Sequence, residues 1–239
     1  MTKGRYVFRV RSYECGADGR MTLPQVGNLL QEAASLHAAA LGFGRGDFAA
    51  AQGDISWVLT RLRLRMRRYP REGEEVTVVT FPRGGRRLVA WRDFELLAAD
   101  GEPLGVATSE WMVIDLASRK LAAVPERALA ARDPANEPVL GTEPFARWRF
   151  PTAADISAQG VFPALHAHID LNGHVNNVHY LEWMLEPAAN RMPAEAEVVF
   201  RSETFAGDEV RVEIAAADGW TCHRVFAPDG RDHVLARTR

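Results

Sequence analysis

The residues best suited to chemistry lie in one short segment, His168 to Glu186, with the sequence HIDLNGHVNNVHYLEWMLE. It places an acid, an amide and an imidazole within five residues, as Asp170, Asn172 and His174. Because the three alternate along the chain, an extended backbone would present all three side chains on one side. A base beside an amide is suited to polarising a carbonyl group and activating a water molecule.

The same segment predicts a helix directly behind these three residues. Apolar side chains recur at helical spacing from Val178 to Leu185, and Asn176 precedes them as a favourable N-cap. Free backbone N–H groups and the positive end of the helix dipole would gather at that point. The alternative is an ordinary polar turn, with Asn172-Gly173 as the turn pair and His174 as a solvated or capping residue.

The composition is that of an ordinary globular protein. The chain has 239 residues, of which 47% are hydrophobic and 25% charged, and its net charge is −2. The two cysteines, Cys15 and Cys222, form neither a disulfide framework nor a metal-ligand cluster, and the first residues include no apolar leader. We therefore expect a cytoplasmic protein with no membrane anchor, no metal or other cofactor, and no nucleic-acid partner.

Hydrophobic periodicity predicts two helices and a series of strands. The expected helices cover Leu23–Leu41 and Asn176–Asn190. The expected strands are Tyr6–Tyr13, Ile55–Tyr69, Glu75–Phe81, Leu88–Ala98, Pro103–Leu116, Val161–Ile169, Ala196–Glu203, Glu209–Ala216, Thr221–Phe226 and His233–Arg237. Asp100-Gly101 is a good hairpin turn, and the stretch from Val124 to Pro151 indicates a linker.

The order strand, helix, several strands thus occurs twice, and an offset of 154 residues aligns the two copies. It sets Asp18 on Asn172, Gly19 on Gly173, Arg20 on His174, Glu32 on Glu186 and Gly16 on Asp170. The first copy keeps the turn but lacks the Asp–Asn–His trio, as in a duplicated module with one chemically active copy. A largely apolar helix followed by a long antiparallel sheet predicts an α+β architecture in which the sheet wraps the helix.

Blocks along nearly the whole chain resemble the acyl-acyl-carrier-protein thioesterases, the hydrolases that end fatty-acid synthesis. The first half carries YECGADGRMTLPQVGNLLQEAASLHAAALGFG, WVLTRLRLRMRRYP and ATSEWMVIDLASRKLAAVPE, in that family's order and at similar spacing. The second half carries DLNGHVNNVHYLEW, similar to the D-x-N-x-H-V-N-N-x-x-Y signature, and then VVFRSETF. The resemblance implies a tandem (double) hot-dog, with an N-terminal hot-dog at 1–127, a linker at 128–150 and a C-terminal hot-dog at 151–239.

The resemblance implies Asp170, Asn172, His174 and Glu203 as catalytic residues. Thr204 stands where the family usually has Cys, which argues against an obligatory thiol nucleophile. No G-x-S-x-G motif is present either, so we expect water to attack the thioester, with Glu203 or His174 as base. A backbone N–H near Asn176 would bind the oxyanion. From composition alone, Glu203 would be an exposed strand carboxylate paired with Arg201 or Arg211.

The family places the acyl chain in the first half, between helix and sheet. Plausible lining residues are Leu29, Leu30, Ala33, Trp57 and Trp111, although each could equally be core.

Arg61, Arg63, Arg65 and Arg67 alternate along one predicted strand and could steer the acidic acyl carrier protein. Further arginines follow at Arg68, Arg71, Arg83, Arg86 and Arg87. The set could equally form a solvated face, with several of its arginines paired with Glu72, Glu74, Glu75 or Glu95. A monomer and a homodimer are both compatible with the sequence.

Three other functions are compatible with the same fold. The nearest is an acyl-CoA thioesterase, because single hot-dog members carry a related D-x-x-G-H-V-N-N pattern. A hot-dog dehydratase would also use His and an acid, but its motif is absent from the sequence. A non-catalytic lipid-binding module is disfavoured by the intact trio in the second copy. The sequence does not predict the length of the acyl chain.

Overall fold

The computed structural model describes residues 3–44, 47, 55–141, 148–151, 156–189 and 191–239. The helical elements are η1 (Ser12–Glu14), α1 (Leu23–Ala40), α3 (Glu126–Leu129), η3 (His166–His168) and α4 (Asn177–Leu185). The strands are β1 (Gly4–Arg9), β2 (Ile55–Met66), β3 (Glu75–Arg86), β4 (Val89–Ala98), β5 (Pro103–Asp115), β6 (Lys120–Ala122), β7 (Ile156–Pro163), β8 (Glu195–Phe200), β9 (Glu209–Ala217), β10 (Trp220–Phe226) and β11 (Asp232–Thr238).

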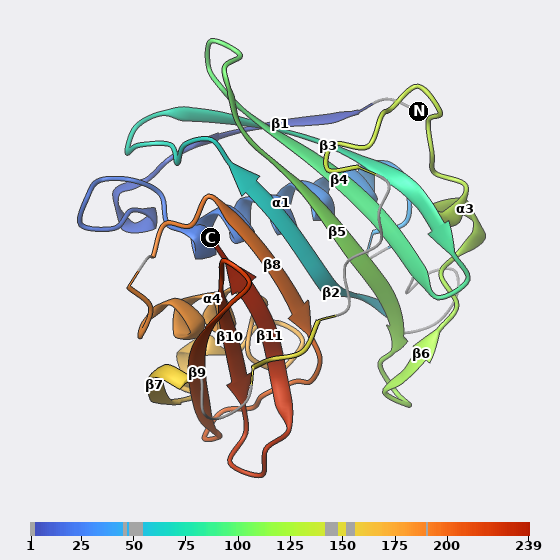
Figure 1. The fold of residues 1–239 in the computed structure, drawn as a ribbon. Coiled ribbons are helices and arrows are strands. Elements are labelled where there is room, and N and C mark those ends of the chain that lie inside the picture. Colours follow the sequence, from blue (N-terminus) through green and yellow to red (C-terminus); the bar gives the residue numbers. More distant parts are fainter. Residues whose placement is uncertain (1–2, 45–46, 48–54, 142–147, 152–155, 190) are drawn as a thin grey trace.

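All the described strands join one antiparallel sheet. Its order is β1-β3-β4-β5-β2-β8-β11-β10-β9-β7, with β6 paired to β5. The order reads the same from either end, because β1, β2, β3, β4 and β5 correspond to β7, β8, β9, β10 and β11. The two halves meet at the pairing of β2 with β8, where Arg63 lies opposite Glu197 (Figure 1). The two expected sheets are therefore one continuous sheet of eleven strands.

The predicted repeat is also present in the connections before the two long helices. A 3-10 helix precedes an isolated bridge in each copy, Cys15 with Met21 and Ile169 with Val175. These pairs are related by the same offset of 154 residues, as are the first residues of α1 and α4.

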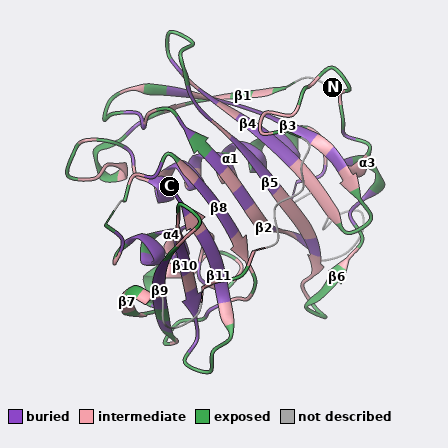
Figure 2. Ribbon diagram, viewed as in Figure 1, coloured by how far each residue is buried: buried purple, intermediate pink, exposed green. Residues whose placement is uncertain are grey.

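The core lies between the sheet and its two long helices. One hydrophobic cluster includes residues from α1, α4 and the inner faces of both half-sheets. The central strands alternate mainly between buried and half-buried residues, whereas the edge strands β1 and β7 alternate between half-buried and exposed ones (Figure 2). The helices approach closely at Gly27, where an added Cβ would lie 3.2 Å from Leu181 Cδ1. Burial of this shared apolar face is the main source of the fold's stability.

Several predicted boundaries were wrong. The strand expected at Val161–Ile169 is instead β7, which ends at Pro163 and is followed by η3. The second helix ends at Leu185, directly before Glu186-Pro187, because proline interrupts a helix. Two short elements, β6 and α3, lie near or inside the predicted linker. No helix in the described part of the chain has the length and apolarity needed to cross a membrane.

Candidate active site

The polar trio lies on a tight turn rather than on an extended strand. The N–H of Gly173 donates to the Asp170 carbonyl at 3.0 Å, and Gly173 has a φ of 81°, which favours glycine. The N–H of Asn172 donates to Asp170 Oδ1 at 2.7 Å. The Asp170 side chain therefore stabilises a turn, and the alternation that would align the three side chains on an extended backbone does not apply. The turn still brings Asp170, Asn172 and His174 together.

The His174 ring lies between two carboxylates. Its Nδ1 is 3.2 Å from the Val175 carbonyl oxygen and 3.9 Å from Asp170 Oδ1. Its Nε2 lies 3.7 Å from Glu203 Oε1. The contact with the Val175 carbonyl favours the tautomer with hydrogen on Nδ1, so Nε2 is left as an acceptor. An imidazole in this position can take a proton, and both carboxylates would stabilise the resulting charge.

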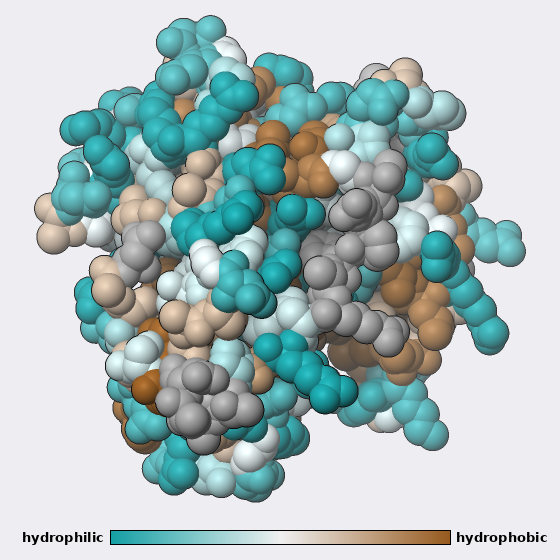
Figure 3. All heavy atoms as spheres, viewed as in Figure 1, coloured by the Kyte–Doolittle hydropathy of each residue, from teal (hydrophilic) through white to brown (hydrophobic). Residues whose placement is uncertain are grey.

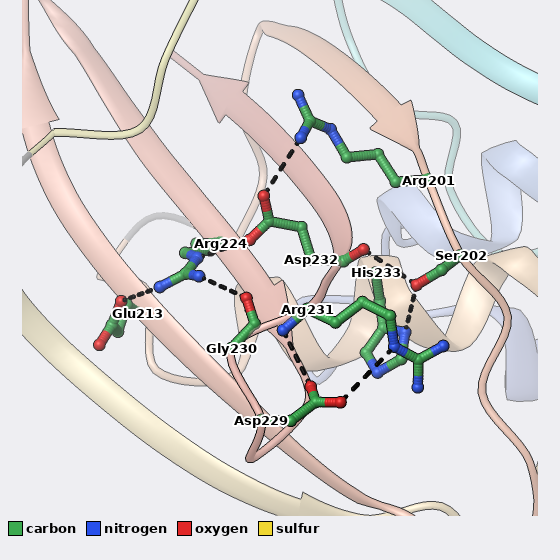
Figure 4. Close-up of polar contacts among 9 residues, drawn as sticks. All are labelled: Arg201, Ser202, Glu213, Arg224, Asp229, Gly230, Arg231, Asp232 and His233. Atoms are coloured by element: carbon green, nitrogen blue, oxygen red, sulfur yellow. Dashed lines mark hydrogen bonds and ion pairs between the residues drawn. The ribbon is translucent and has the colours of Figure 1, made fainter.

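The structure places Glu203 in this site, as the resemblance implied. Glu203 follows the end of β8 and forms an ion pair with Arg119. The alternative pairing with Arg201 or Arg211 was wrong. Arg201 is directed at Asp232 (Figure 4), and Arg211 pairs with Glu209.

Arg119 is a site residue that the sequence analysis missed. It lies in the turn between β5 and β6 with a φ of 56°, and its N–H donates to the Asp115 carbonyl at 2.8 Å. Asp115 Oδ1 accepts the N–H of Ser118 at 2.6 Å, which closes the same turn. The polar sequence Asp115 to Lys120 signals a turn, but nothing in it indicates a partner 84 residues away.

The side-chain amide of Asn172 has a free acceptor. Its Nδ2 donates to Asp170 Oδ2 at 3.3 Å, whereas its Oδ1 is buried and has no partner among the described residues. Asn172 also contributes to the wall of a cavity. A buried carbonyl oxygen without a donor is energetically unfavourable, so this atom is suited to receive a hydrogen from a bound molecule.

The start of α4 supplies the expected N–H group one residue after Asn176. Asn176 is the N-cap, and its Oδ1 accepts the N–H of Val178 at 3.1 Å. Its own N–H is donated to the His168 carbonyl at 3.0 Å and is therefore occupied. The N–H of Asn177, the first helical residue, has no hydrogen-bond acceptor among the described residues. A helix N-terminus favours negative charge at this position.

Thr204 is hydrogen-bonded to the backbone next to His174. It is fully buried, and its carbonyl accepts the N–H of Val175 at 2.9 Å. Its hydroxyl, the Tyr180 hydroxyl and His233 Nε2 are buried without partners among the described residues. Burial raises the pKa of Tyr180 to about 12 and lowers the pKa of His233, so both side chains are neutral near pH 7.

The other nitrogen of the His233 ring has a defined contact. Its Nδ1 lies 2.9 Å from Ser202 Oγ, which donates to the Asp232 carbonyl (Figure 4).

A cavity of about 220 Å³ extends from Asn172 into the first half of the molecule. Trp57 and Trp111 line it as predicted, and Leu30 borders a second, smaller space beside Trp111. Leu29 and Ala33 belong to the hydrophobic core cluster, so their predicted place beside the acyl chain stays a prediction. The helix turns Gln31, Ala34, Ser35 and Ala38 toward the cavity.

The arginines of β2 lie on the outer face of the sheet. Arg61, Arg63 and Arg65 pair there with Glu110, Glu197 and Glu195. Of the suggested partners, Glu74 pairs with Arg68 at 2.8 Å. The three arginines of β2 pair instead with carboxylates of the neighbouring strands β5 and β8. This face is hydrophilic over the junction of β2 and β8 (Figure 3). Arg67 is exposed and forms no ion pair within the described part of the chain.

Comparisons with known proteins identify the family. Residues 2–131 match the acyl-ACP thioesterase N-terminal domain, and residues 155–239 match the acyl-ACP thioesterase C-terminal domain. The palmitoyl-acyl carrier protein thioesterase of Gossypium hirsutum is 28% identical over 97% of this chain and 62% of its own length. Oleoyl-acyl carrier protein thioesterase 2 of Arabidopsis thaliana is 32% identical over 75% of this chain and 52% of its own. The chain therefore spans little more than half the length of these relatives.

Solved structures show the same fold. An acyl-ACP thioesterase from Bacteroides thetaiotaomicron aligns with a TM-score of 0.86 and 25% identity over 99% of this chain and 96% of its own. The 12:0-ACP thioesterase of Umbellularia californica aligns with a TM-score of 0.83 and 24% identity over 98% and 95%. These matches confirm the double hot-dog prediction. This chain belongs to the acyl-ACP thioesterase family.

Proposed function

We propose that this protein hydrolyses fatty acyl thioesters of acyl carrier protein to free fatty acid and holo-carrier. The observation that carries the proposal is the free, buried Oδ1 of Asn172, which lies on a cavity wall in the same turn as His174. The names of the relatives support a thioester of acyl carrier protein as substrate.

The attacking water would lie between Asn172 and His174. Asn172 Oδ1 accepts one hydrogen of the water, and His174 Nε2 accepts the proton that leaves when the water oxygen attacks the thioester carbon. Glu203, 3.7 Å from Nε2, and Asp170 stabilise the imidazolium that forms. Arg119 holds Glu203 in place through their ion pair.

The tetrahedral intermediate then needs a donor and a proton. The free N–H of Asn177 and the dipole of α4 stabilise its oxyanion. When the carbon–sulfur bond breaks, His174 returns its proton to the leaving thiolate. The products are the fatty acid and the free thiol of the carrier, so the reaction balances without an acyl-enzyme.

The two halves would have different functions, one in acyl-chain binding and the other in catalysis. In this proposal 1–127 binds the acyl chain, 151–239 supplies Asp170, Asn172, His174 and Glu203, and 128–150 connects them. Because Arg61, Arg63 and Arg65 are already neutralised by ion pairs, we expect their contribution to carrier binding to be small and that of Arg67 to be larger. The cytoplasmic location and the oligomeric state stay predictions.

Release of free thiol tests the proposal. The substrates are acyl-carrier-protein thioesters of increasing chain length, each beside the matching acyl-CoA. We expect faster release from the carrier protein, with a maximum at one chain length. Faster release from CoA would identify an acyl-CoA thioesterase on the same fold. No release from either carrier would contradict the proposal and favour a binding module.

A further inference from the structure

The cavity contains a buried cation that the proposed reaction does not use. Arg92 lies on β4, is 6% exposed and forms part of the same cavity wall as Asn172. Its Nη1 lies 3.0 Å from His37 Nδ1 and donates to Thr80 Oγ1 at 3.1 Å. Both contacts come from one of the three guanidinium nitrogens.

Arg92 has no counter-ion among the described residues. No carboxylate there lies within ion-pair distance of it, and the neighbouring Asp93 is occupied by Arg83, Thr108 and the N–H of Val139. Burial lowers the pKa of Arg92 to about 10, which still leaves the guanidinium charged at neutral pH. Because a buried cation is unfavourable without a partner, an accepting group on a ligand would be stabilised beside it.

The remaining donors of Arg92 are the second reason to expect a ligand. A guanidinium has five N–H groups, and Nε and Nη2 have no acceptor among the described residues. The cavity is otherwise rich in aromatic side chains, among them Trp57, Trp91 and Trp111. A plain hydrocarbon chain would contact these rings but would leave the Arg92 donors unpaired.

The second half of the molecule handles its buried polar group differently. On the corresponding strand, β10, His223 is buried against α4, and its two ring nitrogens contact the Met184 carbonyl oxygen and Thr238 Oγ1, both at 2.9 Å. The Arg92 guanidinium differs from the His223 ring in having two nitrogens without an acceptor among the described residues.

We propose that the enzyme prefers acyl chains that carry a hydrogen-bond-accepting oxygen, as a hydroxyl or a carboxylate, which lies against Arg92. The oxygen would accept from Nε or Nη2 while the apolar part of the chain packs on the tryptophans. A carboxylate would also neutralise the buried charge. This inference rests on the proposed function, because it names the class of acyl chain that the same site takes.

Matched substrates test the preference in the wild-type enzyme. The panel contains carrier-protein thioesters of decanoate, of each positional isomer of hydroxydecanoate, and of sebacate, the corresponding dicarboxylate. We expect at least one oxygenated chain to have a kcat/KM about tenfold above that of decanoate, the effect of one good charged hydrogen bond. A rate for decanoate equal to or above all the others would overturn the inference.

Two variants locate the effect. Arg92→Met should lose the preference, measured as the ratio of the kcat/KM of the oxygenated chain to that of decanoate, whereas Arg5→Met, on the exposed face of β1, should keep this ratio. If Arg92→Met does not fold, the kcat/KM values of the wild-type enzyme on the matched substrates test the inference by themselves.

Binding provides a readout that does not depend on hydrolysis. Quenching of tryptophan fluorescence would compare methyl decanoate with the methyl hydroxydecanoates and monomethyl sebacate, so that no head-group carboxylate competes for Arg92. Tighter binding of an oxygenated ester supports the inference even if no thioester is cleaved, a result that would contradict the proposed function alone. Equal binding of all the esters, without a rate preference, contradicts the role of Arg92.

Discussion

The turns before α1 and α4 share a backbone and differ in their chemistry. In the first turn, the N–H of Gly16 donates to the Arg20 carbonyl at 2.8 Å; in the second, the N–H of Asp170 donates to the His174 carbonyl at 2.9 Å. Gly19 and Gly173 have φ values of 73° and 81°. Only the second turn carries an acid, an amide and an imidazole. The geometry of the turn is therefore a scaffold, and its side chains decide whether it can catalyse.

The helices that follow differ in what they cover. α1 has 18 residues and borders a cavity with Arg92 in its wall, whereas α4 has 9 residues and packs its backbone against a satisfied His223. The longer helix borders the cavity that we propose for the acyl chain. The shorter helix begins directly after the turn that we propose as catalytic. The proposed division between an acyl-binding first half and a catalytic second half is incomplete, because Arg119 of the first half pairs with Glu203 of the second.

Removing the base should have the largest effect. We expect His174→Asn to lower kcat by about 10² to 10⁴, the usual contribution of a positioned base. Arg20→Asn changes the matching position of the first turn and should leave kcat unchanged. The measurement is thiol release under saturating acyl carrier substrate. Comparable losses in both variants would contradict the assignment of catalysis to the second turn.

Acid should destabilise the second half through His223. Burial lowers the pKa of His223 from 6.5 to about 4. Between these pH values the unfolded chain binds the proton and the folded chain does not, so stability is complete above pH 6.5 and falls as the pH drops toward 4. The maximum contribution is about 3 kcal/mol.

Urea unfolding at about pH 7 and about pH 4.5 measures this effect. The His223→Gln variant should lose less stability over this interval than the wild type. Arg92, the buried cation of the first half, stays charged throughout and should contribute nothing to the difference. An identical loss in wild type and variant would show that other groups cause the acid sensitivity.

The contact between the halves should have an intermediate effect. Arg119→Met removes the partner of Glu203, and we expect kcat to fall roughly tenfold because a misplaced catalytic group loses part of its effect. Arg119→Lys should restore part of the rate. In a Glu203→Gln background the Arg119→Met change should have little further effect, because the two residues act together. Additive losses in kcat would argue against a positioning role.

The smallest effect is expected where the helices of the two copies touch. Gly27→Ala gains about 1 kcal/mol of helix propensity but introduces a Cβ that crowds Leu181, which costs about 1–3 kcal/mol. We expect a net loss near 1 kcal/mol, or roughly 2–4 °C in Tm. The comparison variant is Gly19→Ala, where an added Cβ would meet nothing within 4 Å. Its loss of Tm reports the cost of a positive φ alone, without steric crowding. A higher Tm for Gly27→Ala would show that α1 and α4 can move apart.

Local patterns predicted the elements that position the site. The start of α1 at Leu23, the hairpin turn at Asp100-Gly101 and the Asn176 N-cap were all confirmed. Periodicity and capping are short-range signals, so they are visible in the sequence. The repeat offset was equally visible because both turns need glycine at the same step.

Contacts between distant segments could not be predicted in this way. The ion pair of Arg119 with Glu203 depends on how the turn between β5 and β6 lies relative to the segment after β8, and β6 is too short to show a period. The cavity wall depends on which face of an almost wholly apolar helix meets the core, so Gln31, Ala34, Ser35 and Ala38 could not be selected from the sequence as its lining. Both failures concern tertiary packing rather than local propensity.

The chain-length profile of one cavity variant tests most directly whether the first half binds the acyl chain and the second half catalyses. Ala34 lines the cavity on α1 and is not one of the proposed catalytic residues. Thiol release would be measured for the wild type and Ala34→Leu over acyl-carrier-protein substrates of increasing length. We expect Ala34→Leu to keep the wild-type rate on the shortest chains and to lose activity on the longest. An equal loss at every length, or an unchanged profile, would contradict the claim that the first half binds the acyl chain.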